Sequence, residues 1–170
     1  MGGLLAQGPV ARVELTTEPV RVALDVAPAC RAKFAALAAT IRPAHRLILT
    51  IEGIGFEKPP GFYWELYLNL PEGETSAAIE SEHYVGNLAI YSPAAVSARG
   101  AAVGEATVQN ESSETVDISE SITRLLKRGR FRSDRLTVTF TPQFSGARPR
   151  RVAAPPTPDA WFRRVTLRLE

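Results

Sequence analysis

The residues that could do chemistry are few and scattered along this chain. Only two histidines are present, His45 and His83, so a metal centre with several histidine ligands cannot be built from them. Each stands just before an expected strand, and we interpret both as exposed polar residues. Glu52 and Glu65 could face the solvent side of neighbouring strands, where paired carboxylates are usually just solvated.

Motifs for nucleophilic catalysis and for phosphate binding are missing from the sequence. No serine lies in a G-x-S-x-G elbow, and Gly53 and Gly55 lack the third glycine of a dinucleotide loop. The single cysteine, Cys30, is typical of a small buried apolar residue. We therefore expect no catalytic, cofactor-binding or metal-binding residue, and a chain that is not an enzyme by itself. A weaker alternative is an unrecognised site at a rim of the fold, with Glu65, His83 or His45.

Composition narrows the class of protein further. The 170 residues are 45% hydrophobic and 22% charged, which suffices for a core without disulfides. A net charge of +2 is too small to indicate nucleic acid as a partner. No apolar run approaches the ~18 residues of a membrane span, so we expect no membrane partner. Residues 1–15 lack the features of a signal peptide, so the chain should be cytoplasmic or exported together with a partner.

Two groups of residues could bind a partner. The first is a basic cluster around one aromatic residue: Arg124, Lys127, Arg128, Phe131, Arg130 and Arg132. Such a cluster can contact phosphates, but we favour a solvated helix end whose cations suit the helix dipole. The second group is Tyr63, Tyr67 and Tyr91, which we expect to be exposed. They could form a contact patch for a glycan or a protein, although half-exposed tyrosines are common on sheets.

The stretch 46–70 should organise the core. Residues 47–52 and 62–70 each alternate between apolar and polar side chains, with Trp64 and Leu66 on the apolar face of the second run. A period of two is typical of strands with one buried face. We therefore expect a pair of strands joined by the Gly/Pro-rich connection 55–61, and this pair carries the densest apolar surface of the chain.

Similar alternation predicts the remaining strands at residues 10–15, 20–26, 84–91, 105–110, 114–118, 136–141 and 164–169. Gly86 interrupts one of them, which indicates a bulge or a close approach by another backbone. Connections this short exclude parallel crossovers. The predicted fold is mainly β: an antiparallel, jelly-roll-like β-sandwich or barrel with one short α-helix.

The helix should begin at Asp117 as N-cap, with Glu120 at capping-box spacing, and end at Gly129. Leu125 and Leu126 should pack over one end of the sheet. Residues 29–41 form either a second short helix or a packed loop.

For the domain organisation, we expect residues 1–9 to be a loose or disordered N-terminus and residues 10–170 a single β-sandwich domain. Within it, the Pro- and Arg-rich segment 143–160 should be a long exposed loop.

Several motifs, taken in order, resemble the C-terminal β-domain of tyrosinases and plant polyphenol oxidases. The run LILTIEGI at 47–54 resembles that family's L-x-I-E-G-I strand, and YWEL at 63–66 stands where the plant enzymes have Lys-Phe-Asp-Val. YVGNLA at 84–89, the helix at 117–126 and RLTVTFTP at 135–142 resemble later segments. The resemblance covers residues 10–170, but the copper-binding domain of the family has no counterpart in the chain.

The resemblance implies a non-catalytic lid or partner domain of a di-copper phenol oxidase. In that family this domain docks over the copper site and shields it with a bulky side chain, while six histidines of a separate domain hold the copper. The copper would thus belong to the partner and no cofactor to this chain. Phe56, in the 55–61 connection, is a candidate for the shielding side chain, and the alternative is that it caps the open end of the sandwich. A free-standing β-sandwich module that binds a glycan or a protein is the other hypothesis.

Overall fold

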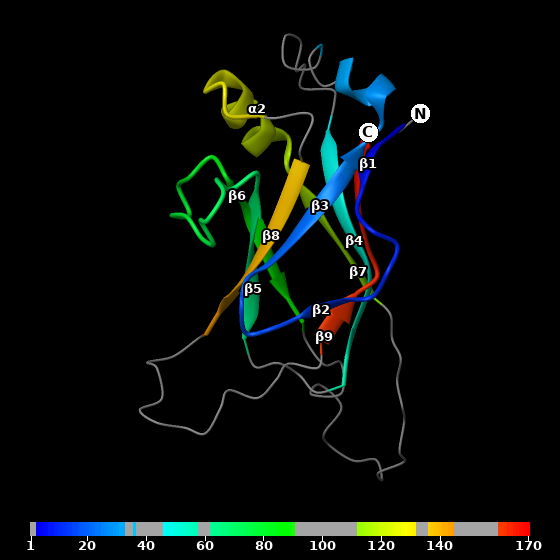
Figure 1. Cartoon of the computed structure of the whole chain (residues 1–170), viewed down its shortest axis with the longest axis vertical. Coiled ribbons are helices and arrows are strands. Elements are labelled where there is room, and N and C mark those ends of the chain that lie inside the picture. The colour runs from blue at the N-terminus through cyan, green and yellow to red at the C-terminus, as the bar shows by residue number, and fades with distance from the viewer. Residues whose placement is uncertain are drawn as a thin grey trace.

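The structure, a computed structural model, describes residues 3–32, 36, 46–57, 62–90, 112–131, 136–144 and 160–170. These residues form ten antiparallel strands in one sheet, helix α2 (Ser119–Lys127) and a short helical segment at 28–32 (Figure 1). The predicted mainly-β antiparallel class is confirmed. The described strands do not close into a barrel, since no ladder joins the two ends of the strand order.

Chain order and spatial order of the strands differ. In chain order they are β1 (Gly3–Gln7), β2 (Val13–Leu15), β3 (Val20–Val26), β4 (Leu47–Phe56), β5 (Tyr63–Leu68), β6 (Tyr84–Ala89), β7 (Ser112–Asp117), β8 (Leu136–Gln143), β9 (Ala160–Phe162) and β10 (Arg164–Leu169). In space they run β2-β9-β4-β10-β1-β3-β8-β5-β6, and β7 pairs with β4. Most neighbours in space are thus distant in the chain.

The sheet folds over on itself at β1 and β3. These two strands share only two residue pairs, Ala6 with Val26 and Gln7 with Asp25. On one side lie β1, β10, β4 and β7, and on the other lie β3, β8, β5 and β6 (Figure 1). The two sides approach each other at β6 and β7, where a Cβ on Gly86 of β6 would lie 3.2 Å from the Val116 side chain of β7. Gly86 also sits at a register shift between β5 and β6, so the expected bulge is present, whereas the group that comes close to Gly86 is a side chain and not the expected backbone.

The two strands of the stretch 46–70 are not paired with each other. β4 pairs with β10, β7 and β9, whereas β5 pairs with β6 and β8. The expectation of a strand pair joined by 55–61 is therefore wrong, and Glu52 and Glu65 do not stand on neighbouring strands. Each strand has a period of two that fits any antiparallel neighbour, so the pattern cannot select the partner.

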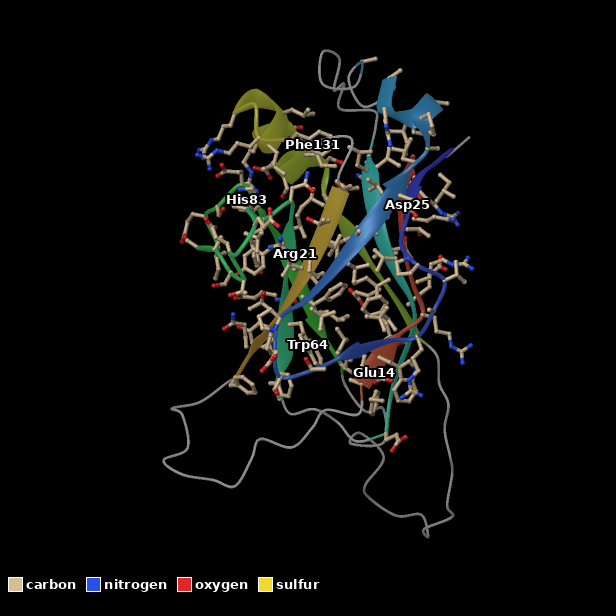
Figure 2. All side chains as sticks on the ribbon, viewed as in Figure 1. Glu14, Arg21, Asp25, Trp64, His83 and Phe131 are labelled. Carbon is tan, nitrogen blue, oxygen red and sulfur yellow. The ribbon has the colours of Figure 1, made fainter. Side chains whose placement is uncertain are left out.

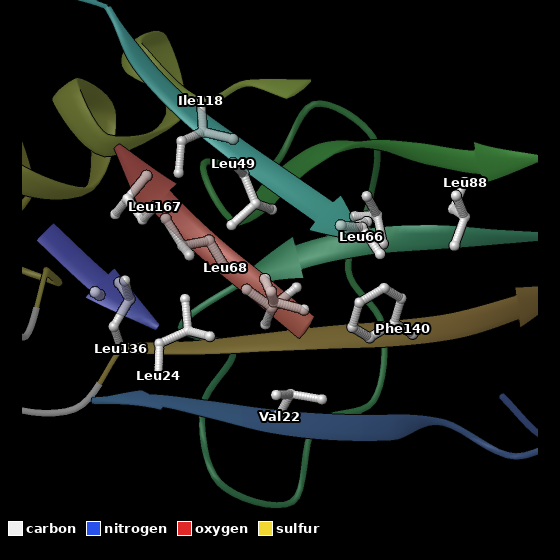
Figure 3. Close-up of a cluster of buried hydrophobic side chains, with 14 of the residues drawn as sticks. Val22, Leu24, Leu49, Leu66, Leu68, Leu88, Ile118, Leu136, Phe140 and Leu167 are labelled. Carbon is white, nitrogen blue, oxygen red and sulfur yellow. The ribbon is translucent and has the colours of Figure 1, made fainter. Parts of the chain in front are cut away.

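One hydrophobic core fills the space between the two sides of the sheet. Leu49 of β4 and Leu66 of β5, both without exposed surface, belong to the same buried cluster (Figure 3). Phe140 of β8 stacks on Phe162 of β9, with ring centroids 4.9 Å apart. Trp64 is completely buried and donates its indole N–H to the Thr16 carbonyl oxygen at 3.3 Å. The stretch 46–70 therefore does organise the core, from two opposite sides.

Glycines let β4 follow two partners in succession. Residues 47–52 of β4 pair with β10, and its last residues, Gly55 and Phe56, pair with β9. Gly53 has φ 67° at the bulge, a backbone region that favours glycine. A Cβ on Gly55 would lie 2.6 Å from the Trp161 ring. The G-I-G sequence therefore serves a bend and a close packing contact.

Helix α2 begins one residue later than predicted. Its N-cap is Ile118, without a side-chain cap, because Asp117 still belongs to β7 and pairs with Ile48. The Asp117 carboxylate nevertheless accepts the backbone N–H of Ser119 at 3.0 Å. Leu125 is fully buried, Leu126 packs against the core, and the turn at Gly129 ends the helix as expected.

The N-terminus also differs from the prediction. Residues 1–9 were expected to be loose, but Gly3–Gln7 form β1, which pairs with β10 and β3. Leu5 and Ala6 are buried in the core. A segment this short shows no alternation that could reveal a central strand, since its burial follows from two neighbours that lie far along the chain.

Candidate functional site

The outward side of β5 and its two neighbours carries a group of polar and aromatic side chains. The register places Asn87 of β6 and Thr141 of β8 on either side of Glu65, and it places Tyr84 beside Tyr67. We call this surface the outer β5 face, and its residues are Tyr63, Glu65, Tyr67, Tyr84, Asn87, Thr141 and Gln143.

Glu65 lies at the centre of the outer β5 face. Only 8% of its surface is exposed. Its Oε2 accepts a hydrogen bond from the Tyr67 hydroxyl at 2.6 Å and another from Gln143 Nε2 at 2.8 Å. Two neutral donors therefore hold one oxygen of a buried carboxylate in a defined position.

The segment 71–80 covers part of this face and buries Tyr67. The Tyr67 hydroxyl lies 2.9 Å from the Ala77 carbonyl oxygen, and Thr141 donates its hydroxyl to the Thr75 carbonyl oxygen. Arg21 of β3 fastens the same segment through the carbonyl oxygens of Pro71 and Glu74 (Figure 2). The expectation that Tyr67 is exposed is therefore wrong, because a connection between strands folds back over the polar face of β5.

Burial and the nearby carboxylate change the acidity of two tyrosines. Desolvation, together with the hydrogen bond and the charge of Glu65, raises the pKa of Tyr67 far above its ordinary value. Desolvation and the charge of Glu65 also raise the pKa of Tyr84. The Tyr67 and Tyr84 rings meet edge to face, with centroids 5.8 Å apart. Both phenols are thus favoured in the neutral form, and the Tyr67 hydroxyl donates its hydrogen bond to Glu65.

A second buried carboxylate lies beside the end of α2. Glu82, 5% exposed, accepts hydrogen bonds from Arg128 at 2.7 Å and from Arg130 at 3.0 Å. A hydrogen bond from its own backbone N–H, followed by these two arginines, lowers the pKa of Glu82. Two members of the predicted basic cluster are therefore engaged in an internal ion pair. Arg132, another member, lies outside the described residues.

His83 is buried, in contrast to the expectation that it is exposed. Only 4% of its surface is exposed, and it lies on the α2 side of the molecule (Figure 2). Its Nδ1 lies 2.8 Å from the Leu68 carbonyl oxygen and must carry the proton, because a carbonyl only accepts. Its Nε2 has no hydrogen-bond partner among the described residues. His45 lies outside the described residues.

Aromatic side chains gather at the end of the molecule where β4 finishes and β5 begins. The centroid of the Phe62 ring lies 4.8 Å from the ring centroids of both Trp64 and Phe144. Of the Phe144 surface, 54% is exposed. Phe56 is half-buried and packs against the core. It lines a cavity of about 190 Å³ together with Ile54, Leu88 and Glu114.

The predicted contact tyrosines are not brought together as one exposed patch. Tyr63 is half-buried on the outer β5 face, Tyr67 is enclosed beside it, and Tyr91 lies outside the described residues. The sequence prediction missed Tyr84, Asn87 and Gln143. Their place beside Glu65 depends on which strands flank β5, and alternation alone does not reveal this.

The described residues offer neither a metal cluster nor a membrane-spanning helix. Across the described ranges, no three His, Cys, Asp or Glu side chains lie close enough to hold a metal ion. No helix in the described part of the chain is long and apolar enough to cross a membrane. Cys30 is buried, as expected, and 8% exposed.

The fold and the buried polar face define an antiparallel β-sandwich domain. Residues 7–153 match the model of a family described as a domain of unknown function (DUF7868), and the chain therefore belongs to that family. No curated protein matches the sequence at a significant level.

Solved structures of a polyphenol oxidase have a similar fold. One is a recombinantly expressed latent aurone synthase (polyphenol oxidase), with 14% identity and a TM-score of 0.51. Another is the same protein co-crystallized with hexatungstotellurate(VI) and soaked in H2O2, with 16% identity and a TM-score of 0.50. Each alignment covers 93% of this chain and 25% of the other. The chain thus spans about a quarter of the length of these structures, and the likeness establishes a shared fold.

Proposed function

We propose that this chain is a non-catalytic accessory domain of a polyphenol-oxidase-like di-copper enzyme. The observation that carries the proposal is the alignment of nearly the whole chain with one quarter of a latent polyphenol oxidase. The sequence motifs that resemble the C-terminal domain of this family support it independently. Two of them, at 47–54 and 63–66, form β4 and β5, which supply opposite sides of the core.

We further propose that the aromatic end of the molecule docks on the oxidase and covers its copper site. Phe144 is exposed there and packs at a tilt against Phe62, so an aromatic side chain is already positioned for a partner. Phe56 stands at the same end, but its packing against the core fits the role of a cap at least as well as that of a shielding side chain. Tyr63, at the start of β5, would lie at the rim of this contact.

A first experiment tests whether the chain is catalytic by itself. The purified chain should contain no stoichiometric copper and should not oxidise a diphenol, because the copper ligands would belong to the partner. Metal analysis after reconstitution with Cu²⁺, followed by an oxygen-consumption assay, measures both. A di-copper centre in this chain would overturn the proposal.

A second experiment tests the docking. The chain is added to a di-copper phenol oxidase domain encoded with it or beside it, and the rate of diphenol oxidation is measured. The rate should fall in a saturable way, and Phe144→Ala should weaken this inhibition. Ile79→Ala, which removes another exposed apolar side chain (59% exposed) on the covering segment, serves as the control. The absence of both inhibition and complex formation would contradict an accessory role.

The second candidate function is a free-standing module that binds a glycan or a protein. The half-buried Tyr63 and Tyr84 beside Glu65 favour it, because aromatic rings next to polar groups are typical of recognition surfaces. A specific ligand from a glycan array or a pull-down, without any copper-enzyme partner, would support this function over the first.

A further inference from the structure

The two buried carboxylates of this protein are treated differently by their surroundings. Glu82 pairs with two arginines, Arg128 and Arg130. Glu65 is almost as buried, yet its partners are the neutral Tyr67 hydroxyl and the neutral Gln143 amide. Among the described residues, no lysine or arginine lies within ion-pair distance of Glu65. Within the part of the chain that the structure describes, the charge of Glu82 is therefore balanced by two arginines, and the charge of Glu65 has no such partner.

An unbalanced carboxylate in this position is costly. Removing a carboxylate from water costs several kcal/mol unless a counter-charge or enough donors replace the water. Both neutral donors of Glu65 bind the same oxygen, Oε2. Oε1 accepts no hydrogen bond from the described residues, and it is not among their fully enclosed atoms without a partner. Oε1 therefore keeps some contact with solvent, and among the described residues it has no donor that a ligand would have to displace.

The groups around Glu65 suit a planar cation. The half-buried rings of Tyr63 and Tyr84 stand on the same face of the sheet, and Asn87 lies directly opposite Glu65 in the β5–β6 register. A cation over a tyrosine ring is attracted by the negative face of the ring, and the attraction is stronger when the cation is desolvated. A guanidinium also donates to a carboxylate with matching geometry and is more weakly hydrated than an ammonium.

We propose that the outer β5 face binds a cationic side chain of a protein partner, with Glu65 as its counter-charge and an arginine guanidinium as the best fit. A neutral ligand such as a sugar would satisfy the hydrogen bonds but would leave the carboxylate charge unbalanced. The raised pKa values of Tyr67 and Tyr84 agree with a negative charge at this place. The proposal goes beyond the accessory function and does not depend on it, because any protein partner with a suitably placed arginine would qualify.

The test uses the full chain and a minimal probe. Nα-acetyl-arginine amide is titrated into the isotope-labelled protein, and the side-chain amide signals of Gln143 and Asn87 are followed by NMR. We expect saturable shifts of both signals. The matching citrulline amide, which has the same shape without the charge, should produce none. Citrulline shifting these signals as strongly as arginine would overturn the proposal.

Substitutions locate the binding on Glu65. Glu65→Gln keeps the size and the acceptor for Tyr67 and should weaken arginine binding about tenfold or more. Tyr63→Ala, which leaves both hydrogen bonds to Glu65 intact, should weaken it several-fold and guards against a folding defect in the first variant. Glu114→Gln, on β7, removes a carboxylate away from this face and should change nothing.

Three results would refute the site: unchanged arginine binding in Glu65→Gln, no saturable response in the native protein, or a neutral oligosaccharide that shifts the same amides while arginine does not. None of these results affects the inhibition test of the accessory function, which depends on the aromatic end of the molecule. The two proposals can therefore fail separately.

Discussion

The strands β4 and β5 have the same alternating sequence pattern, but their polar faces lie in different environments. Each buries its apolar face in one core, β4 through Leu49 and β5 through Leu66. On the other face, Thr50 and Glu52 of β4 remain half-exposed, whereas Glu65 and Tyr67 of β5 are buried. The difference comes from segment 71–80, which returns over β5 and is held there by Arg21.

This comparison shows what makes a polar face a candidate site. The polar face of β4 meets water, and its Glu52 lies 3.8 Å from Arg164 in a surface ion pair of small energetic value. The polar face of β5 is shielded, so its carboxylate acts at a lower effective dielectric and alters the pKa of Tyr67. The burial of the polar face by segment 71–80, rather than the types of residue on that face, therefore makes β5 different from β4.

The largest predicted effect concerns Tyr67, on the covered face of β5. Tyr67→Ala should destabilise the protein by about 3–5 kcal/mol, as expected for a buried aromatic side chain, although the sequence places it on the polar face. Thr50→Ala, the matched change on β4, should cost no more than about 0.5–1 kcal/mol. Denaturant unfolding of both variants measures the difference. Equal losses would mean that β5 is not covered more completely than β4.

A smaller effect is expected at the end of β4. Gly55→Ala would place a methyl group 2.6 Å from the Trp161 ring, and this overpacking should cost about 1–3 kcal/mol. Gly3→Ala, whose new Cβ would meet nothing within 4 Å, is the control and should have little effect. A neutral Gly55→Ala in the same thermal unfolding assay would show that β4 tolerates a different path toward β9.

The cover over β5 can be loosened without touching β5. Arg21→Ala removes two hydrogen bonds, of 3.0 and 2.7 Å, to the carbonyl oxygens of Pro71 and Glu74. We expect a loss of about 0.5–1.5 kcal/mol in unfolding free energy. Hydrogen exchange should rise in segment 71–80 while the amides of β4 remain protected. Uniform faster exchange over both strands would instead indicate a global effect.

The smallest effect at neutral pH concerns ionisation. The raised pKa of Tyr67 favours the neutral phenol in the folded state, so its contribution to stability is complete below pH 10.0, its ordinary pKa, and is lost as the pH rises above it. Part of the tyrosinate absorbance of the folded protein should therefore appear late in an alkaline titration. In Tyr67→Phe this late part should shrink. A single transition at the ordinary pKa in the native protein would contradict the burial of Tyr67.

The sequence predicted where the strands lie more accurately than it predicted which strands pair with each other. The strand at 20–26 matches β3 residue for residue, and the strand at 164–169 matches β10. These features follow from local alternation and its interruptions, which a single chain segment already contains.

The candidate site was predicted only in part. Tyr63 and Tyr67 were identified, but Tyr67 was expected to face solvent, and His83 was also expected to be exposed. Both are buried, and Tyr67 is covered by segment 71–80, whose own composition is polar. A polar connection is usually an exposed loop, so no sequence pattern indicates that it covers a strand.

The amino-acid sequence by itself determined that this protein is a mainly antiparallel β-domain with a helix near residues 117–128 and a core centred on residues 46–70. Hydrophobic periodicity is a local property, and it decides which face of each strand is buried. Only the tertiary structure decided that β4 and β5 lie on opposite sides of the core, and that Glu65 is shielded while Glu52 is not. Strand pairing and loop cover join residues far apart in the chain, and many partners satisfy the same alternation equally well.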